Sequence, residues 1–152
     1  MPEIIEVKKY IDFINKFVKN KQLLAVNIKN GRYHKHKPFE NYDKLKKELP
    51  IKLLEVNSKG KFIYFTFENN FYLLNTLGLS GGWAFIPNNS TKYKIPKLLE
   101  YIGTDNINNI NNYLESNLKH INVEFIFSSG KLVFFDTLSF GTLKVEIDIN
   151  LL

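Results

Sequence analysis

The order of apolar and polar positions divides the chain into one leading helix and a series of short strands. From residue 3 to about residue 19, apolar side chains recur every three or four positions, which is the helical period of about 100° per residue. We therefore predict an amphipathic helix with an apolar face and a charged face. The apolar face holds Ile4, Val7, Tyr10, Ile11, Ile14, Phe17 and Val18, and the charged face holds Lys8, Lys9, Asp12 and Lys16.

Beyond the polar residues 19–21 the pattern changes to period two or to short apolar runs, which are typical of strands. Residues 30–39 form a basic, aromatic loop, and Asn69 and Asn70 favour a tight hairpin because asparagine tolerates positive φ. Short helices are predicted at 41–49 and around 107–118. Strands are predicted at 23–29, 51–57, 61–67, 71–77, shortly after the glycine-rich stretch 77–83, and at 123–127, 131–136 and 141–149.

Many short strands with turn signals between them favour an antiparallel sandwich or barrel. We predict a mostly β, α+β fold, namely an antiparallel β-sandwich of about eight strands with a leading N-terminal helix. The chain has 152 residues, of which 44% are hydrophobic and 14% aromatic, and this is enough for one core. With no internal repeat and no linker, residues 1–152 form one domain.

The composition excludes several classes of protein. The net charge of +6 suits a nucleic-acid partner, although many soluble proteins are as basic. Cysteine is absent, so neither a disulfide nor a thiolate zinc site is possible. The first residues are charged and lack the apolar core of a signal peptide, and no apolar run approaches the roughly 20 residues that span a bilayer. We expect a soluble intracellular protein without a membrane association, metal or cofactor.

The first six residues contain the candidate chemistry. Glu3 lies in the middle of the apolar helix face and Glu6 lies at its edge. A buried, unpaired carboxylate is costly, so it is protonated, paired or functional, or else it only complements the helix dipole. Removal of Met1 would leave Pro2 with a secondary amine, and an α-amino group (pKa about 7.7–8.0) is a better neutral-pH nucleophile than lysine. The ordinary alternative is that Pro2 simply starts the helix.

Four segments, in order, resemble the formamidopyrimidine-DNA glycosylase and endonuclease VIII family. MPEIIEV resembles the family's start, SKGKFIYF its lysine-bearing hairpin, and LNTLGLSGGW its H-L-G-M-S-G loop. KHINVEFIFSSGKLVFFDTLSFGTLKV resembles the stretch that ends in D-P-R-R-F-G. The resemblance spans residues 2 to 145 and covers the family's N-terminal catalytic domain, while the helix–two-turn–helix domain and the C-terminal finger have no counterpart.

The resemblance implies a base-excision-repair glycosylase with abasic-site lyase activity on oxidised bases. Pro2 matches the proline that attacks C1′ of the flipped nucleotide and forms a Schiff base, after which elimination cuts the strand. Glu3 matches the acid that protonates the opening deoxyribose, and Glu6 matches the glutamate that supports the site. Lys61 matches the lysine that binds phosphate beside the lesion.

The implied partner is damaged DNA. Leu79 and Phe140 match apolar residues that intercalate where the base is flipped out, although both could instead be core or loop residues. His120 matches a DNA-contacting histidine, with an ordinary surface residue as the alternative. Arg32, together with residues 34–37, adds positive charge suited to phosphates, and the alternative is a solvated loop.

Two residues depart from the family in the segment that contains Phe140. Leu138 replaces the arginine that reads the orphaned base, usually cytosine, and Ser139 replaces a phosphate-binding arginine. A bidentate arginine contact is worth about 1–3 kcal/mol of discrimination, so preference for cytosine is in doubt and the chain is closer to endonuclease VIII. Thr76 stands where histidine is common, and Ile5 replaces a proline.

Four readings of the shortened sequence follow. The chain is a minimal lyase or a catalytic domain that needs a second subunit for the missing DNA-binding half. Alternatively it is a noncatalytic DNA-binding domain, or an inactive truncated remnant.

Overall fold

The structure is a computed structural model that describes residues 4–96 and 107–147, with side chains described for residues 6–96 and 111–147. Pro2 and Glu3, two of the candidate catalytic residues, lie outside the described residues, as do residues 97–106 of the asparagine-rich stretch. In the parts of the chain that the structure describes, every helix is too short or too polar to span a membrane.

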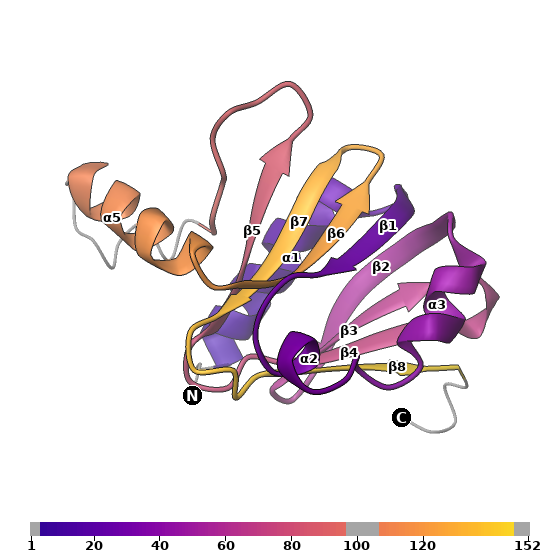
Figure 1. The fold of residues 1–152 in the computed structure, drawn as a ribbon. Coiled ribbons are helices and arrows are strands. Elements are labelled where there is room, and N and C mark those ends of the chain that lie inside the picture. The colour runs from indigo at the N-terminus through magenta and orange to yellow at the C-terminus, as the bar shows by residue number, and fades with distance from the viewer. Residues whose placement is uncertain (1–3, 97–106, 148–152) are drawn as a thin grey trace.

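The order of elements follows the sequence pattern closely (Figure 1). The helices are α1 (Ile4–Val18), α2 (Arg32–Lys35), α3 (Tyr42–Glu48) and α5 (Ile107–Leu118), with a 3-10 turn η1 at Glu68–Asn70. The strands are β1 (Gln22–Ile28), β2 (Ile51–Lys59), β3 (Phe62–Phe67), β4 (Tyr72–Thr76), β5 (Gly81–Pro87), β6 (Ile121–Phe127), β7 (Gly130–Asp136) and β8 (Thr142–Glu146).

The eight strands form one antiparallel sheet in the order β5-β7-β6-β1-β2-β3-β4-β8. The halves on either side of β1 and β2 face each other: the ring of Trp83 on β5 lies 5.2 Å from the ring of Phe65 on β3. Trp83 also contacts Phe125 and Phe134, at centroid distances of 5.7 and 5.1 Å. Because apolar side chains from both halves meet here, the predicted antiparallel sandwich is confirmed.

Helix α1 packs against β2, β3 and β5 through the face that periodicity predicts. Val7, Ile14 and Val18 on this face are fully buried, and the predicted charged face is exposed. The ring of Phe17 stacks on Phe85 of β5 at 4.7 Å. The side chain of Asn15 both donates to and accepts from the backbone of Val56, at 2.7 and 2.8 Å, which fixes α1 against β2.

Two local expectations have different outcomes. The hairpin between β3 and β4 is confirmed, since Asn69 and Asn70 have φ values of 62° and 63°. The segment 30–39, predicted as a loop throughout, contains the short helix α2. This helix has no buried residue, so hydrophobic periodicity gives no sign of it.

Candidate functional site

The register of the strands brings most candidate residues to one end of the sheet, which we call the site end. Because every pairing is antiparallel, the last residues of β1, β2, β4 and β7 lie beside the first residues of β6, β3, β8 and β5. The site end therefore carries the connections that contain Arg32, Lys61, Leu79, His120 and Phe140. The pairs that define it are Ile28↔Val123, Lys59↔Phe62, Thr76↔Thr142 and Gly81↔Asp136.

Two connections at the site end, residues 77–80 and residues 137–141, are in direct backbone contact. Gly78 has φ +63°, and a Cβ placed on it would lie 2.8 Å from the amide nitrogen of Gly141 and 2.9 Å from the carbonyl carbon of Phe140. Any larger side chain at this position would push the two loops apart. The glycine-rich stretch of the sequence is thus explained by a close loop–loop approach.

One buried carboxylate, that of Asp136, holds both loops. Asp136 is 1% exposed. Its Oδ1 accepts a hydrogen bond from the Ser80 hydroxyl, and its Oδ2 accepts one from the amide of Gly141 at 2.7 Å. The Ser80 hydroxyl oxygen in turn accepts from the amide of Leu138 at 2.9 Å. We call these four residues the loop clasp, because they connect the two loops through one side chain.

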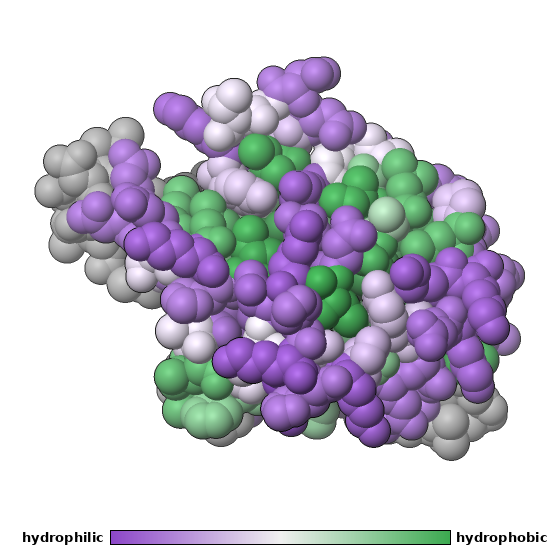
Figure 2. Space-filling view, viewed as in Figure 1, coloured by the Kyte–Doolittle hydropathy of each residue, from purple (hydrophilic) through white to green (hydrophobic). Residues whose placement is uncertain are grey.

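The loop clasp presents apolar side chains to solvent. Leu79 is 62% exposed, Phe140 is 61% exposed and Leu138, whose amide belongs to the clasp, is 50% exposed. Figure 2 shows a hydrophobic cluster at the lower left, over the connection between β7 and β8. An exposed apolar cluster on a rigid base is a feature of interaction surfaces. The structure thus removes the alternative that Leu79 and Phe140 are core residues.

His120 and the basic segment around Arg32 lie beside the loop clasp. The carbonyl of His120 accepts a hydrogen bond from the amide of Asp136 at 3.0 Å, and the His120 side chain is exposed. Arg32 is also exposed, and its guanidinium lies 5.6 Å from the centre of the Tyr33 ring. The Tyr33 hydroxyl accepts a hydrogen bond from the amide of Leu143 at 2.9 Å and donates one to the carbonyl of Leu143 at 3.1 Å, which ties α2 to β8.

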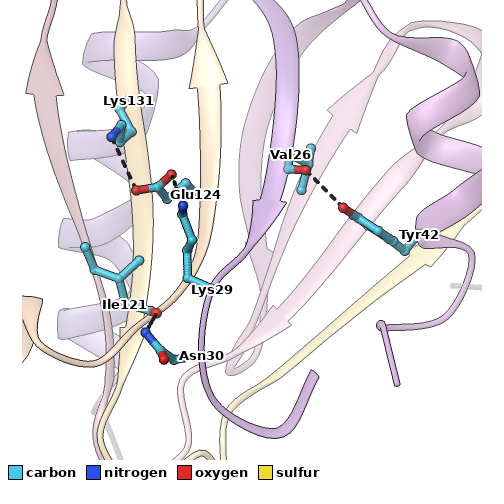
Figure 3. Close-up of polar contacts among 7 residues, drawn as sticks. All are labelled: Val26, Lys29, Asn30, Tyr42, Ile121, Glu124 and Lys131. Carbon is cyan, nitrogen blue, oxygen red and sulfur yellow. Dashed lines mark hydrogen bonds and ion pairs between the residues drawn. The ribbon is translucent and has the colours of Figure 1, made fainter. Parts of the chain in front are cut away.

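The residues that lead into α2 are also attached to the sheet (Figure 3). The Asn30 side-chain amide donates to the carbonyl of Ile121 at 3.1 Å. Glu124 lies between two lysines, 3.9 Å from Lys29 and 3.3 Å from Lys131. The basic segment is consequently held against β6 and β8 in a defined position.

Lys61 and Glu6 occupy the same end of the molecule. Lys61 is exposed and lies in the turn between β2 and β3, where Gly60 has φ +61°. Glu6 is half-buried in the first turns of α1. The first half of α1 also lies at the site end. The hydroxyl of Tyr10 on α1 packs against Gly82 near the start of β5, only 2.5 Å from the position that a Cβ on Gly82 would occupy. Pro2 and Glu3 precede this turn in sequence.

Sequence reasoning missed a pair of tyrosines beside Glu6. Burial raises the pKa of Tyr10 well above its usual value, and a hydrogen bond to the Tyr113 hydroxyl and the charge of Glu6 raise it further. Burial also raises the pKa of Tyr113, which comes from α5. The available signal was a tyrosine at a fully apolar helix position, since a buried hydroxyl requires a partner.

The cavities beside the basic segment around Arg32 are open to solvent and are lined by several basic side chains. One of about 480 Å³ lies between the basic segment and the start of β8 and is lined by Arg32, His36, Lys37, Glu40 and Lys144, among others. Lys144 is paired with Glu146 at 2.6 Å and with Glu40 at 3.8 Å, so the unpaired positive charge among these residues comes from the basic segment. Among the described residues, no three histidine, cysteine, aspartate or glutamate side chains are grouped as they would be around a metal ion. The chemistry available here is that of an anion-binding surface with apolar tips.

Residues 1–143 match the model of the formamidopyrimidine-DNA glycosylase N-terminal domain. The chain belongs to this family. A formamidopyrimidine-DNA glycosylase of Mycoplasma genitalium is 30% identical over 146 residues, which are 93% of this chain and 41% of that protein.

The fold is also that of family members with solved structures. A Lactococcus lactis enzyme in complex with DNA containing an abasic site has a TM-score of 0.68 and 18% identity, covering 95% of this chain and 44% of that one. The same enzyme with DNA containing an oxidised pyrimidine has a TM-score of 0.67. The chain spans less than half the length of these relatives.

Proposed function

We propose that this chain is the catalytic domain of a base-excision-repair DNA glycosylase that also cuts abasic sites. The observation that carries the proposal is the loop clasp. Its buried carboxylate fixes the two loops whose exposed side chains are Leu79 and Phe140, at the end of the sheet where α1 begins. An enzyme that acts on a base must first flip it out of the duplex, and apolar side chains commonly fill the space that it leaves. An anion-binding surface beside apolar wedges suits this substrate.

The proposed reaction starts at Pro2 after removal of Met1. The neutral secondary amine attacks C1′ of the flipped nucleotide, the bond from C1′ to the damaged base breaks, and the base leaves with the proton that the amine gives up. Glu3 supplies a proton to the ring oxygen of the opening deoxyribose, and the nitrogen becomes an iminium. The iminium makes the 2′ proton acidic, so its removal expels the 3′ phosphate and cuts the strand.

The remaining candidates are assigned to binding and support. Glu6 stabilises the N-terminal site, and Lys61 and Arg32 contact phosphates. His120 lies beside the clasp, where it would contact the backbone of the same DNA. Since this surface neutralises few phosphates, we propose that binding is weak and therefore easily lost when salt is added, and that a second subunit supplies further contacts. Action on oxidised bases and a soluble intracellular location are part of the same proposal.

Borohydride trapping on abasic-site DNA tests the proposal. The correctly processed chain is expected to form a covalent adduct that disappears when the N-terminus is extended by one residue and falls strongly in Glu3→Gln. Lys61→Ala is expected to reduce trapping at limiting enzyme, whereas Lys21→Ala, an exposed lysine at the opposite end of the sheet, serves as the matched control.

The outcomes separate the alternatives. Binding to abasic DNA without an adduct would favour a noncatalytic DNA-binding domain. The absence of both binding and adduct would favour an inactive remnant. An intact mass that retains Met1 would remove the nucleophile and overturn the proposed chemistry.

A further inference from the structure

The two loops that the loop clasp joins carry three exposed apolar side chains and not two, and we call these three side chains the tip. In the described residues, six large apolar side chains are exposed, and Leu79, Leu138 and Phe140 are three of them. The amide of Leu138 is fixed to the hydroxyl of Ser80, which directly follows Leu79. The base of this tip is therefore rigid across both loops, although Leu79 and Phe140 are far apart in sequence.

The polar groups of these two loops are occupied in holding them together. The Ser80 hydroxyl donates to Asp136 and accepts from Leu138, and the second oxygen of Asp136 accepts from Gly141. Ser139 is half-buried, and its hydroxyl lies 3.5 Å from the carbonyl of Asp136. Thr137 retains an exposed hydroxyl, but a hydroxyl both donates and accepts and therefore pairs with any base.

We propose that Leu138 is the third residue of an apolar wedge that fills the duplex at the lesion without reading the opposite base. Leucine and phenylalanine side chains have no hydrogen-bond donor or acceptor, and the contacts that they make with the face of a base are available from all four bases. Discrimination between bases requires directed donors or acceptors, such as the fork of an arginine. The substrate class that follows is a lesion opposite any of the four bases.

This inference rests on the proposed function, and a binding assay tests it. The probe is a duplex with a stable tetrahydrofuran abasic analogue opposite A, C, G or T, measured by fluorescence anisotropy at one salt concentration. For the unmodified chain the four dissociation constants are expected to agree within about threefold, and a larger spread overturns the inference.

Two variants locate the effect at residue 138. Leu138→Arg is expected to create a spread of at least tenfold among the four duplexes, because it places a fork of donors at the opposite base. The matched control is Leu24→Arg, which adds the same charge to an exposed leucine near the opposite end of β1 and is expected to leave the four dissociation constants equal to one another. A Leu138→Arg protein that behaves like Leu24→Arg overturns the assignment.

The Leu138→Ala variant tests the wedge itself. It is expected to weaken binding to the abasic duplexes at least threefold while leaving binding to an undamaged duplex unchanged, and unchanged binding to both overturns the assignment. If the unmodified chain forms the borohydride adduct but prefers one opposite base, only this inference fails. If it neither forms the adduct nor prefers abasic over undamaged DNA, the proposed function fails with it.

Discussion

The two ends of the sheet are built in different ways. At the site end, four of the six exposed large apolar side chains in the described residues, namely Phe62, Leu79, Leu138 and Phe140, lie on or beside the connections. At the opposite end, two of the connections are short and polar: η1 joins β3 to β4, and residues 128–129 join β6 to β7. The last two exposed leucines lie within strands β1 and β2.

Both ends contain long-range hydrogen bonds, such as the one from the Ser129 hydroxyl to the carbonyl of Phe17 at the opposite end, but the site end is also held by a buried carboxylate. The turn at Asn69 and Asn70 needs only residues that tolerate positive φ. In the loop clasp the Asp136 carboxylate is buried and accepts hydrogen bonds from neutral donors. Burial of a charged group costs free energy, and here the hydrogen bonds that offset this cost also fix the two loops. The difference indicates that the loop clasp fixes two loops that present exposed apolar side chains, whereas the β3–β4 turn at the opposite end forms from its own residues.

Removal of the buried carboxylate should give the largest difference between the ends. Asp136→Ala leaves the amide of Gly141 and the hydroxyl of Ser80 without their acceptor, so we expect a loss of about 3 kcal/mol in the free energy of unfolding. The control at the opposite end is Glu68→Ala, since the exposed Glu68 carboxylate accepts from the amide of Lys52 at 3.1 Å. Its expected cost is about 0.5 kcal/mol. Urea denaturation measures both, and equal losses would contradict the comparison.

High pH should weaken the site end through Tyr10. Its pKa is raised in the folded protein by burial, so the unfolded chain loses this proton first, near pH 10. The contribution of Tyr10 to the free energy of unfolding is therefore complete below pH 10, and it is lost as the pH rises through the pKa of Tyr10 in the folded protein.

The variant Tyr10→Phe isolates this contribution. At pH 7 it is expected to cost about 1 kcal/mol, for the lost hydrogen bond to Tyr113. Above pH 10 the difference in the free energy of unfolding between the variant and the unmodified protein, which we call the gap, should narrow. Lys144, whose pKa is raised by its hydrogen bond to Glu146, titrates in both proteins and cancels in the difference. Urea denaturation between pH 7 and 11 measures the gap, and a constant gap would refute the role of Tyr10.

The smallest expected effect concerns phosphate binding at the site end. Arg32→Ala should weaken binding to any duplex by a similar factor and reduce the slope of log K against log salt concentration by about 1. The comparison variant is Lys21→Ala at the opposite end, which should leave the slope unchanged. Titrations at several salt concentrations give the slopes, and the same slope change in both variants would mean that the basic segment is not a specific phosphate contact.

The sequence by itself determined the elements and many of the candidate residues. Helical periodicity placed Val7, Ile14 and Val18 in the core, and the paired asparagines fixed the β3–β4 turn. Both signals are local, because burial of one helix face and a positive φ are properties of a few neighbouring residues. The motifs also indicated Leu79 and Phe140, and both are exposed at the site end in the structure.

Only the tertiary structure decided how these residues are held. Ser80 and Asp136 are 56 residues apart, and Tyr33 and Leu143 are 110 apart, so no window of sequence shows that they meet. Tyr10 and Tyr113 are likewise brought together from α1 and α5. These contacts follow from the register of the strands and from the pairing of β4 with β8, which depend on how the whole core packs. Hydrophobic periodicity reports which side of an element is buried, but not which distant residue lies against it.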